Sequence, residues 1–479
     1  MADSSKILAQ LDPLADIATV DLGDKRRNAR YAQMIAALMH QPDRSMPQVC
    51  DDEAACEAYY RFNRNPKIKD EALLLPHFEA TAKRSERLRE VLCHHDTTKL
   101  SFPVHDDELP ENLARRSKNR QGFLWHASLV TSADGLRAGL GLVATKAFVH
   151  ESELPDAPSK AFWKARQGLY ENEKWRWHDS VVAAEQRLSE VPKVTHVFDR
   201  EFDDFQMLFC MHVDAYEYVA RACYDRKVCT GERRKDFGRL TEALSERKWR
   251  GKRKVELSPR SKAQADACHP ARRRRTATLQ ARSQTVELRR PNSVPAASAP
   301  DRIEVNVVEV TEKRPPKGEE PVYWLLLTSR PVDTLEQVWA VVDTYRARWT
   351  IEEYFKALKT GCGYEKLQHR SAKTLLCALA QHAVVAHYLL VLRHLGRHAD
   401  KIPAEVALTA AQIQILVALL PKYLSAQPTV GEAMLAVARL GGHLRSNGPP
   451  GWQVLGRGWQ RLQEYERAFA LGLQAKTDL

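Results

Sequence analysis

The sequence predicts an α/β fold with a sheet of mixed strand direction, flanked by helical regions at both ends. Two observations predict it. Between residues 90 and 230, short apolar strands alternate with helical patterns. Residues 1–70 and the residues from about 373 onward instead show helical patterns with turn and cap residues between them. Alternation of strands and helices is typical of an α/β sheet, and the terminal regions read as separate helical units.

Length and charge narrow the class of protein. The chain has 479 residues, which suggests two to four domains. Its 44% hydrophobic and 28% charged residues exclude a wholly disordered protein. The 73 basic and 61 acidic side chains give a net charge of +12. That balance favours a polyanionic partner, since net charge bears on association more than on fold.

The first 70 residues predict basic helices. Asp24 is placed to cap a helix, because its carboxylate can accept from a free amide of the first turn. Arg27 and Arg30 follow at a spacing of three and therefore share one face. A second helix, over residues 52–63, contains Arg61.

The region from 90 to 230 predicts the sheet. A strand over 91–96 ends in Asp96, and another over 194–199 ends in Asp199. The dipeptide Asp134-Gly135 between two apolar runs is a strong hairpin signal. The remaining expected elements are strands over 128–132, 136–143 and 216–222 and helices over 171–188 and 202–211.

Residues 247–290 are dense in Lys and Arg and include the run Arg272 to Arg275. One reading is a solvated loop. A basic surface along a nucleic-acid path is favoured, because the run lies between folded segments. Strands over 302–310 and 322–328 follow, and residues 336–360 predict a helix.

The nine cysteines show no CxxC pair, which argues against a disulfide framework. Cys210, His212, Cys223 and Cys229 are conceivable zinc ligands, but their spacing matches no usual zinc pattern. Partly buried thiols in a reduced cytosol are the favoured reading.

The amino terminus lacks the apolar run of a secretory signal. The longest apolar stretch, residues 375–392, is interrupted by Gln381, His382 and His387. It is therefore predicted to be a buried helix rather than a membrane span. We expect a cytoplasmic protein.

Three acidic residues stand out as candidate metal ligands. Asp96 and Asp199 each follow an apolar strand, where functional side chains tend to lie, and Glu352 lies on the predicted 336–360 helix. At 100° per residue, that helix gathers polar side chains within a sector of about 60°. They are Tyr345, Arg348, Glu352 and Lys359. A salt-bridged surface helix is the plainer reading of this group.

The full set of motifs adds a resemblance. Asp-Thr-Thr at 96–98, Asp-Arg-Glu at 199–201 and Tyr-x2-Arg-x3-Glu-x6-Lys at 345–359 resemble the IS-four family of bacterial DDE cut-and-paste DNA transposases, in its Tn-five-like branch. Further similar segments occur in the same order along the chain. They are Leu22-Gly23-Asp24 with Arg26, Arg27 and Arg30, then Tyr60-Arg61-Phe62, residues 315–319, residues 324–329 and residues 438–442.

The resemblance implies a particular layout. It implies an RNase H-like core of the retroviral integrase superfamily, over 71–372, with a β-rich basic insertion at about 230–330. A helical end-DNA-binding domain over 1–70 would precede the core. A helical dimerisation domain over 373–479 would follow it.

The resemblance also implies the chemistry. Asp96 would bridge two Mg²⁺ or Mn²⁺ ions, and Asp199 and Glu352 would each hold one. Hard cations prefer carboxylate oxygens, and two such ions can activate an attacking oxygen and stabilise a leaving one.

Residues that contact DNA are implied in the same way. Trp324 would stack on a flipped base of a hairpin intermediate, although by itself it reads as a core strand residue. At the position of Cys223 the family has a lysine that helps to bind the hairpin phosphates. Its replacement by cysteine puts this part of hairpin binding in doubt. Phosphate contacts are implied for Tyr345, Arg348, Lys359 and Arg221, and contacts to the element ends for Arg27, Arg30 and Arg61.

The function expected is therefore that of a DNA transposase. It would bind terminal inverted repeats, act as a homodimer on paired ends and join them to target DNA, in the bacterial cytoplasm in association with the nucleoid. Two alternatives stay open: an end-binding regulator that does not cut, and a host nuclease of the RNase H superfamily.

Overall fold

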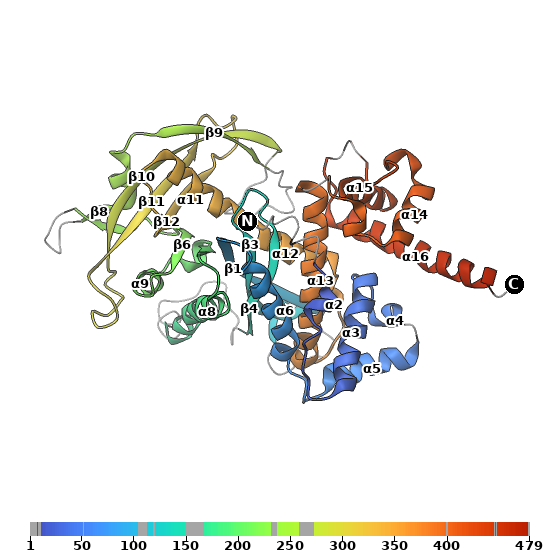
Figure 1. Cartoon of the computed structure of the whole chain (residues 1–479). Helices are drawn as coiled ribbons and strands as arrows, with labels where there is room; N and C mark the ends of the chain where they lie inside the picture. Colours follow the sequence, from blue (N-terminus) through green and yellow to red (C-terminus); the bar gives the residue numbers. More distant parts are fainter. Residues whose placement is uncertain are drawn as a thin grey trace.

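The structure is a computed structural model of the whole chain (Figure 1). It describes residue 7 and residues 11–50, 52–103, 113–117, 120–149, 167–230, 237–257, 273–398, 401–444, 446 and 448–477. A long sheet runs through the middle of the molecule, with the amino-terminal and carboxy-terminal helices gathered beyond one end of it (Figure 1).

The amino-terminal region is helical, as predicted. Asp24 accepts from the amide of Arg26 at 2.8 Å, and Asp52 accepts from that of Ala55 at 2.7 Å, so both predicted helices begin at a capping carboxylate. The helices are α2 (Pro13–Asp16), α3 (Lys25–His40), α4 (Met46–Val49), α5 (Glu53–Arg64) and α6 (Asp70–Ser85).

One 12-stranded sheet forms the core, in the order β2-β3-β1-β5-β6-β12-β11-β10-β7-β8, with β4 beside β3 and β9 beside β10. Its first half comprises β1 (Val91–Pro103), β2 (Ala114–Ser117), β3 (Arg120–Ser132), β4 (Gly139–Phe148), β5 (Val194–Phe198) and β6 (Glu217–Arg221). Strand β1 runs antiparallel to β3 and parallel to β5, and β5 runs parallel to β6. The predicted hairpin and the predicted mixed sheet are therefore both confirmed.

The predicted end of the first strand, at Asp96, was wrong. Asp96 does not end β1, which continues to Pro103 because β3 pairs with it along its whole length. Asp199 does follow the last residue of β5. In the parallel pair, Val91 lies beside Val194 and His94 beside Val197. The same register, carried on by two residues, sets Asp96 level with Asp199.

Helices cover both faces of this part of the sheet. Helix α8 (Gln167–Arg187) and helix α9 (Phe205–Val213) lie on one face, and α11 (Leu335–Ala347) lies on the other. Successive side chains of a strand point to opposite faces. Residues of β1 and β5 therefore divide between two different environments, one under α8 and one under α11.

The second half of the sheet is the β-rich region predicted between 230 and 330. It contains β7 (Lys227–Cys229), β8 (Phe237–Arg239), α10 (Leu240–Ser245), β9 (Arg250–Leu257), β10 (Arg275–Arg289), β11 (Arg302–Glu312) and β12 (Tyr323–Thr328). Part of the basic segment is strand rather than loop. Arg282 pairs with Glu309 at 2.5 Å, and Arg275 pairs with Glu312 and Glu319. Residues 258–272, with Arg272, lie outside the described residues.

The helix predicted over 336–360 is three consecutive segments. Helix α11 ends at Ala347, α12 spans Trp349–Lys356, and η3 (Ala357–Gly361) has π-helical geometry. The break falls at Arg348, whose amide bonds to the carbonyl of Tyr345 three residues back, at 3.1 Å, instead of four back. The predicted helical region is therefore confirmed, with an interruption of the regular hydrogen bonding at Arg348.

The carboxy-terminal region is helical. After η4 (Tyr364–Lys366) come α13 (Ala372–His398), η5 (Ala404–Val406), α14 (Ala410–Leu419), η6 (Pro421–Tyr423), α15 (Val430–Leu440) and α16 (Trp452–Thr477). Residues 372–397 are long and apolar enough to cross a membrane, but 83% of that window is buried inside the fold. Helix α13 packs against α3, α5 and α6, so the prediction of a buried helix is confirmed.

Candidate active site

Three acidic side chains from distant parts of the chain meet at one guanidinium group. Arg348 Nη1 lies 2.9 Å from Asp96 Oδ2, while Nη2 lies 2.6 Å from Glu352 Oε1 and 3.3 Å from Asp199 Oδ2. The structure thus brings together the three acids predicted to form one site. It also places Arg348, which was expected on the same helix face and as a phosphate contact, at their centre.

Local structure fixes each acid. Asp96 and Asp199 lie on neighbouring parallel strands at the same level, and β5 ends there, which leaves Asp96 open on that side. Asp199 Oδ1 accepts from the amide of Arg200 at 2.8 Å and so caps the short helix η1 (Arg200–Phe202). Glu352 lies one turn after Arg348, at the start of α12. The kink at Arg348 therefore turns both side chains toward the strand ends.

The pKa values of Asp96 and Asp199 are shifted in opposite directions. Burial raises the pKa of Asp96 to about 7, and the charges of Glu352 and Asp199 add to that effect against the opposing charge of Arg348. Burial also acts on Asp199, but Arg348 and the amide of Arg200 outweigh it and lower its pKa. The three carboxylates raise the pKa of Arg348, which stays cationic.

Tyr345 and Trp324 line the same site. The Tyr345 hydroxyl donates to Asp199 Oδ1 at 3.2 Å, and burial raises its pKa to about 12, so it remains a hydrogen-bond donor. Trp324, on β12, is half-buried and meets the Tyr345 ring edge to face, with 5.7 Å between the ring centroids. Trp324, for which the sequence left open a core role or a stacking role, therefore lies partly exposed beside Tyr345, which in turn contacts Asp199.

Two predicted cations lie at the rim instead of among the acids. Lys359 Nζ donates to the backbone carbonyl of Lys99 at 2.6 Å. Arg221, the last residue of β6, lies near enough to Asp199 to lower its pKa, and its Nη2 is 3.4 Å from the carbonyl of Tyr323. Neither Arg221 nor Lys359 lies at the centre of the three acids, which Arg348 occupies.

The segment after β6 also departs from expectation. Cys223 is exposed, and its backbone amide donates to Asp203 Oδ2 at 2.6 Å. Two cations follow Cys223 closely enough to take the place of the lysine that the family has there, and the first, Arg226, is held by Asp203 at 2.5 Å. Lys227, the other, lies 4.1 Å from the ring centroid of Phe237 and is exposed.

The predicted end-binding arginines differ in exposure. The Arg61 side chain is 71% exposed and forms a long ion pair, 3.9 Å, with Glu57. Arg30 is partly exposed on α3. Arg27 donates to the carbonyl of Leu22 at 3.1 Å and so also holds the turn before the helix.

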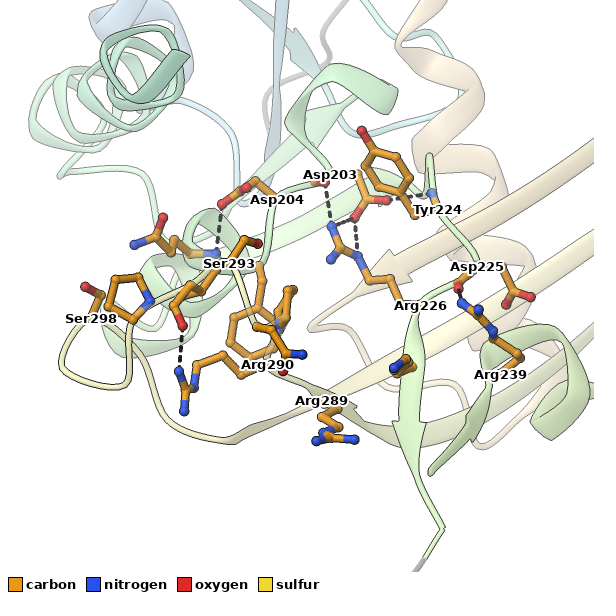
Figure 2. Close-up of a pocket in the computed structure, with 17 residues that line it drawn as sticks. Asp203, Asp204, Tyr224, Asp225, Arg226, Arg239, Arg289, Arg290, Ser293 and Ser298 are labelled. Carbon is orange, nitrogen blue, oxygen red and sulfur yellow. Dashed lines mark hydrogen bonds and ion pairs between the residues drawn. The ribbon is translucent and has the colours of Figure 1, made fainter. Parts of the chain in front are cut away.

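A separate cavity of about 710 Å³ opens on the β-rich region (Figure 2). None of the three acids lines it. Arg226 and Arg290 there pair with Asp203 and Asp301, while Arg289 lies 4.7 Å from the ring centroid of Phe237. Sequence analysis missed this hollow, because it forms only where the loop 291–298 folds back beside β7 and β10.

The acid cluster has the ligand chemistry of a divalent-cation site, although in this structure Arg348 lies between the acids and their oxygens do not all lie within 4.8 Å of one another. Its donors are carboxylate oxygens from three elements, the ligand type that Mg²⁺ and Mn²⁺ prefer, and they already converge on a positive group. The cysteine and histidine set considered from sequence is different: among the described residues, three such ligands gather only at Cys93, His95 and His196.

Two known protein families match the chain. Residues 15–68 match the family described as Transposase DNA-binding, and residues 200–386 match the Transposase DDE domain. Together, the two matches support a DDE transposase, a metal-dependent enzyme that cuts and moves DNA. The second match implies an RNase H-like core, with which the mixed sheet and its helices agree, and DDE domains generally use divalent metal ions. DNA is thereby supported as the partner.

Proposed function

We propose that this chain is a cut-and-paste DNA transposase of the IS-four type. It binds terminal inverted repeats, cleaves the element ends through a hairpin intermediate and joins them to target DNA. The observation that carries the proposal is the convergence of Asp96, Asp199 and Glu352 on the Arg348 guanidinium, at 2.6–3.3 Å. A regulator that binds ends without cutting has no use for three converging carboxylates.

The acids hold the metal in this proposal. Asp96, Asp199 and Glu352 would hold the divalent ions through their carboxylate oxygens. When bound, a pair of such ions supplies an activated oxygen nucleophile and stabilises the leaving oxygen. Tyr345 keeps Asp199 oriented through its 3.2 Å hydrogen bond. Arg348 balances the carboxylate charge before the ions arrive and is then available to a phosphate.

The rim residues bind the DNA strand end. Arg348, Lys359 and Arg221 surround the acids with positive charge, and a guanidinium matches a phosphate through two parallel hydrogen bonds. Trp324 offers a partly exposed indole beside Tyr345, 5.7 Å between centroids, which suits stacking by a base that has left the helix. This arrangement supports the proposal of hairpin formation rather than simple nicking.

Recognition of the element ends falls to the amino-terminal helices, in the region that matches the Transposase DNA-binding family. Arg30 and Arg61 supply exposed or partly exposed charge there, and Arg27 orders the turn that presents them. The contact surface of the homodimer is assigned to the last helix, α16. Helix α16 extends beyond the body of the fold toward the carboxyl end (Figure 1) and exposes Tyr465 and Leu471.

The experiment compares cleavage of DNA that carries the source element's terminal repeats, with Mg²⁺, by the wild type and by Asp96→Asn, Asp199→Asn and Glu352→Gln. Each variant should lose nicking and hairpin formation and keep end binding. Glu336→Gln, an exposed acid in the first turn of α11, is the matched control and should cut normally. Metal-dependent cutting by any one of the three variants at the wild-type rate would overturn the assignment.

A further inference from the structure

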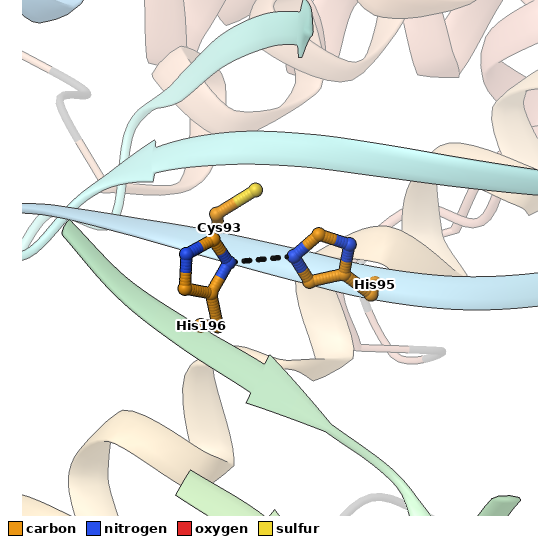
Figure 3. A group of neighbouring side chains, drawn as sticks. All are labelled: Cys93, His95 and His196. Atoms are coloured by element: carbon orange, nitrogen blue, oxygen red, sulfur yellow. Dashed lines mark hydrogen bonds between the residues drawn. The ribbon is translucent and has the colours of Figure 1, made fainter. Parts of the chain in front are cut away.

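A second cluster of metal-binding side chains lies on the opposite face of the strands that carry Asp96 and Asp199. Cys93 and His95 are two residues apart on β1 and therefore share a face. His196 on β5 is the register partner of Cys93. Figure 3 shows the imidazole rings of His95 and His196 facing each other, with the Cys93 side chain beside them. One ligand atom from each lies within 4.8 Å of the other two, and all three side chains are fully buried.

The two imidazoles are already oriented as metal ligands usually are. His95 Nε2 and His196 Nδ1 face each other at 2.8 Å. The other nitrogen of each ring has its own partner: Ser128 Oγ lies 2.9 Å from His95 Nδ1, and Glu185 Oε1 lies 2.7 Å from His196 Nε2. A ligating histidine almost always hydrogen-bonds through its second nitrogen to such a group, which fixes the ring and its tautomer.

We propose that Cys93, His95 and His196 bind one thiophilic d¹⁰ ion, Zn²⁺ or Cu⁺. One sulfur and two imidazole nitrogens are the donors that these ions select, whereas Mg²⁺ prefers oxygen. The site is thus chemically distinct from the acidic one. It does not depend on transposase activity, and no motif spacing reveals it, because its ligands come from two strands about a hundred positions apart.

Binding of the metal ion would move one proton within His95 and release one proton from Cys93. The Glu185 carboxylate accepts, so Nε2 of His196 carries that ring's proton and Nδ1 has a free lone pair. His95 therefore donates from Nε2 in the absence of metal. On binding, its proton is relocated to Nδ1, which then donates to Ser128 Oγ. The Cys93 thiol loses its proton to solvent, and the thiolate binds the ion.

The distance between the two histidine nitrogens needs only a small adjustment to bind one ion. Two nitrogens each about 2.0–2.1 Å from one tetrahedral ion lie about 3.3 Å apart. The two rings, now 2.8 Å apart, must therefore separate by about half an ångström. The bound ion would join β1 to β5 directly behind Asp96 and Asp199. We infer that it stiffens the pair of strands that sets the spacing of these two acids.

The test uses the full-length chain, reduced and stripped with a chelator, in excess Mg²⁺ to occupy the carboxylates. One equivalent of Zn²⁺ alone, or of Cu⁺ alone, is added, and the metal-edge X-ray absorption spectrum is recorded. We expect one sulfur neighbour, for zinc at about 2.3 Å, and two imidazole nitrogens. The ion that gives this shell is the one the site takes. A shell of oxygen alone, or no uptake of either ion, would refute the proposal.

Variants assign the spectrum to these residues. Cys93→Ser should lose the sulfur neighbour. Cys377→Ser is the matched control, a buried thiol whose hydrogen-bond partners are Lys373 and the carbonyl of Ile68, and it should keep the wild-type shell. Ser128→Ala removes only the orienting hydroxyl and should weaken binding about 10- to 100-fold, which decides the matter if Cys93→Ser does not fold. An unchanged sulfur shell in Cys93→Ser, or unchanged affinity in Ser128→Ala, would count against the site.

Discussion

Arg348 and Asp96 are 252 positions apart in the chain, and their side chains meet at 2.9 Å. The same guanidinium also reaches Asp199 and Glu352. A positive charge buried at the focus of three carboxylates offsets their mutual repulsion when no metal is bound. This relationship explains how three acidic side chains can lie around one point of the fold without a bound metal.

The first prediction concerns that balance. Arg348→Met should lower the free energy of unfolding by about 3–5 kcal/mol in EDTA, because it leaves buried carboxylates unpaired. Millimolar Mg²⁺ should restore much of the loss if the acids bind divalent ions. Thermal or denaturant unfolding with and without Mg²⁺ measures both effects. Arg346→Met is the control: Arg346 pairs with Asp343 at the surface and should cost about 0–1 kcal/mol. Equal metal rescue of both variants would contradict the prediction.

The second prediction concerns Trp324. Its replacement by Ala should remove about 1–3 kcal/mol of base stacking, roughly a 10- to 100-fold loss of hairpin formation, and leave the first nick nearly unchanged. Trp339→Ala is the control, since Trp339 is also partly buried and packs against the same apolar cluster. The readout is the nick-to-hairpin ratio on one labelled end, together with the melting temperature. If Trp324→Ala impairs nick and hairpin equally and unfolds the chain, Trp324 is structural.

The third prediction concerns end binding. Arg30→Gln and Arg61→Gln should each weaken binding to terminal repeats and reduce the slope of log affinity against log salt by about 0.9, because each phosphate contact releases a counterion. Lys422→Gln, an exposed cation of the carboxy-terminal region, should leave the slope unchanged. Binding assays at several salt concentrations decide between these outcomes. An unchanged slope in both arginine variants would place the recognition surface elsewhere.

The fourth prediction concerns pairing of two copies. Leu471 on α16 is 65% exposed, and a charge there would oppose burial against a partner. Leu471→Glu should reduce paired-end complexes on native gels while single-end binding persists. Val417→Glu, which adds the same charge at another exposed apolar position, should leave pairing intact. Full pairing by Leu471→Glu would exclude this part of α16 from the dimer.

The fifth prediction concerns stability against acid. Asp16 is buried and bonded to Arg84 at 2.5 Å and to His77 at 3.2 Å. Burial opposes ionisation, but these two bonds prevail and hold the pKa of Asp16 well below its usual value. Its contribution to stability is therefore complete above the unfolded-state pKa of about 3.9 and is lost as the pH falls below that value.

Asp16→Asn should accordingly cost about 3–5 kcal/mol at pH 7, with a gap to the wild type that narrows below pH 4. Denaturant unfolding between pH 2 and pH 7 measures it. Glu464→Gln, which breaks the exposed pair with Arg44, should cost no more than about 1 kcal/mol throughout. A constant gap for Asp16→Asn across this range would mean that its loss is not electrostatic.

The local patterns of the sequence determined much of the fold. The capping carboxylate of Asp24 marked where one helix begins, and Asp134-Gly135 marked a hairpin. Each of these signals acts over a few residues, through hydrogen bonds and turn geometry that neighbours supply. The same is true of the strand before Asp199, which ends where its apolar run ends.

Tertiary structure alone decided the rest. Pairing with β3 carries β1 past Asp96, a kink at Arg348 breaks the predicted helix, and Lys359 bonds to a backbone carbonyl of β1. The parallel register of β1 and β5 sets two acids side by side on one face and Cys93, His95 and His196 together on the other. Such contacts join residues a hundred or more positions apart, and their geometry depends on strand pairing that local propensity does not encode.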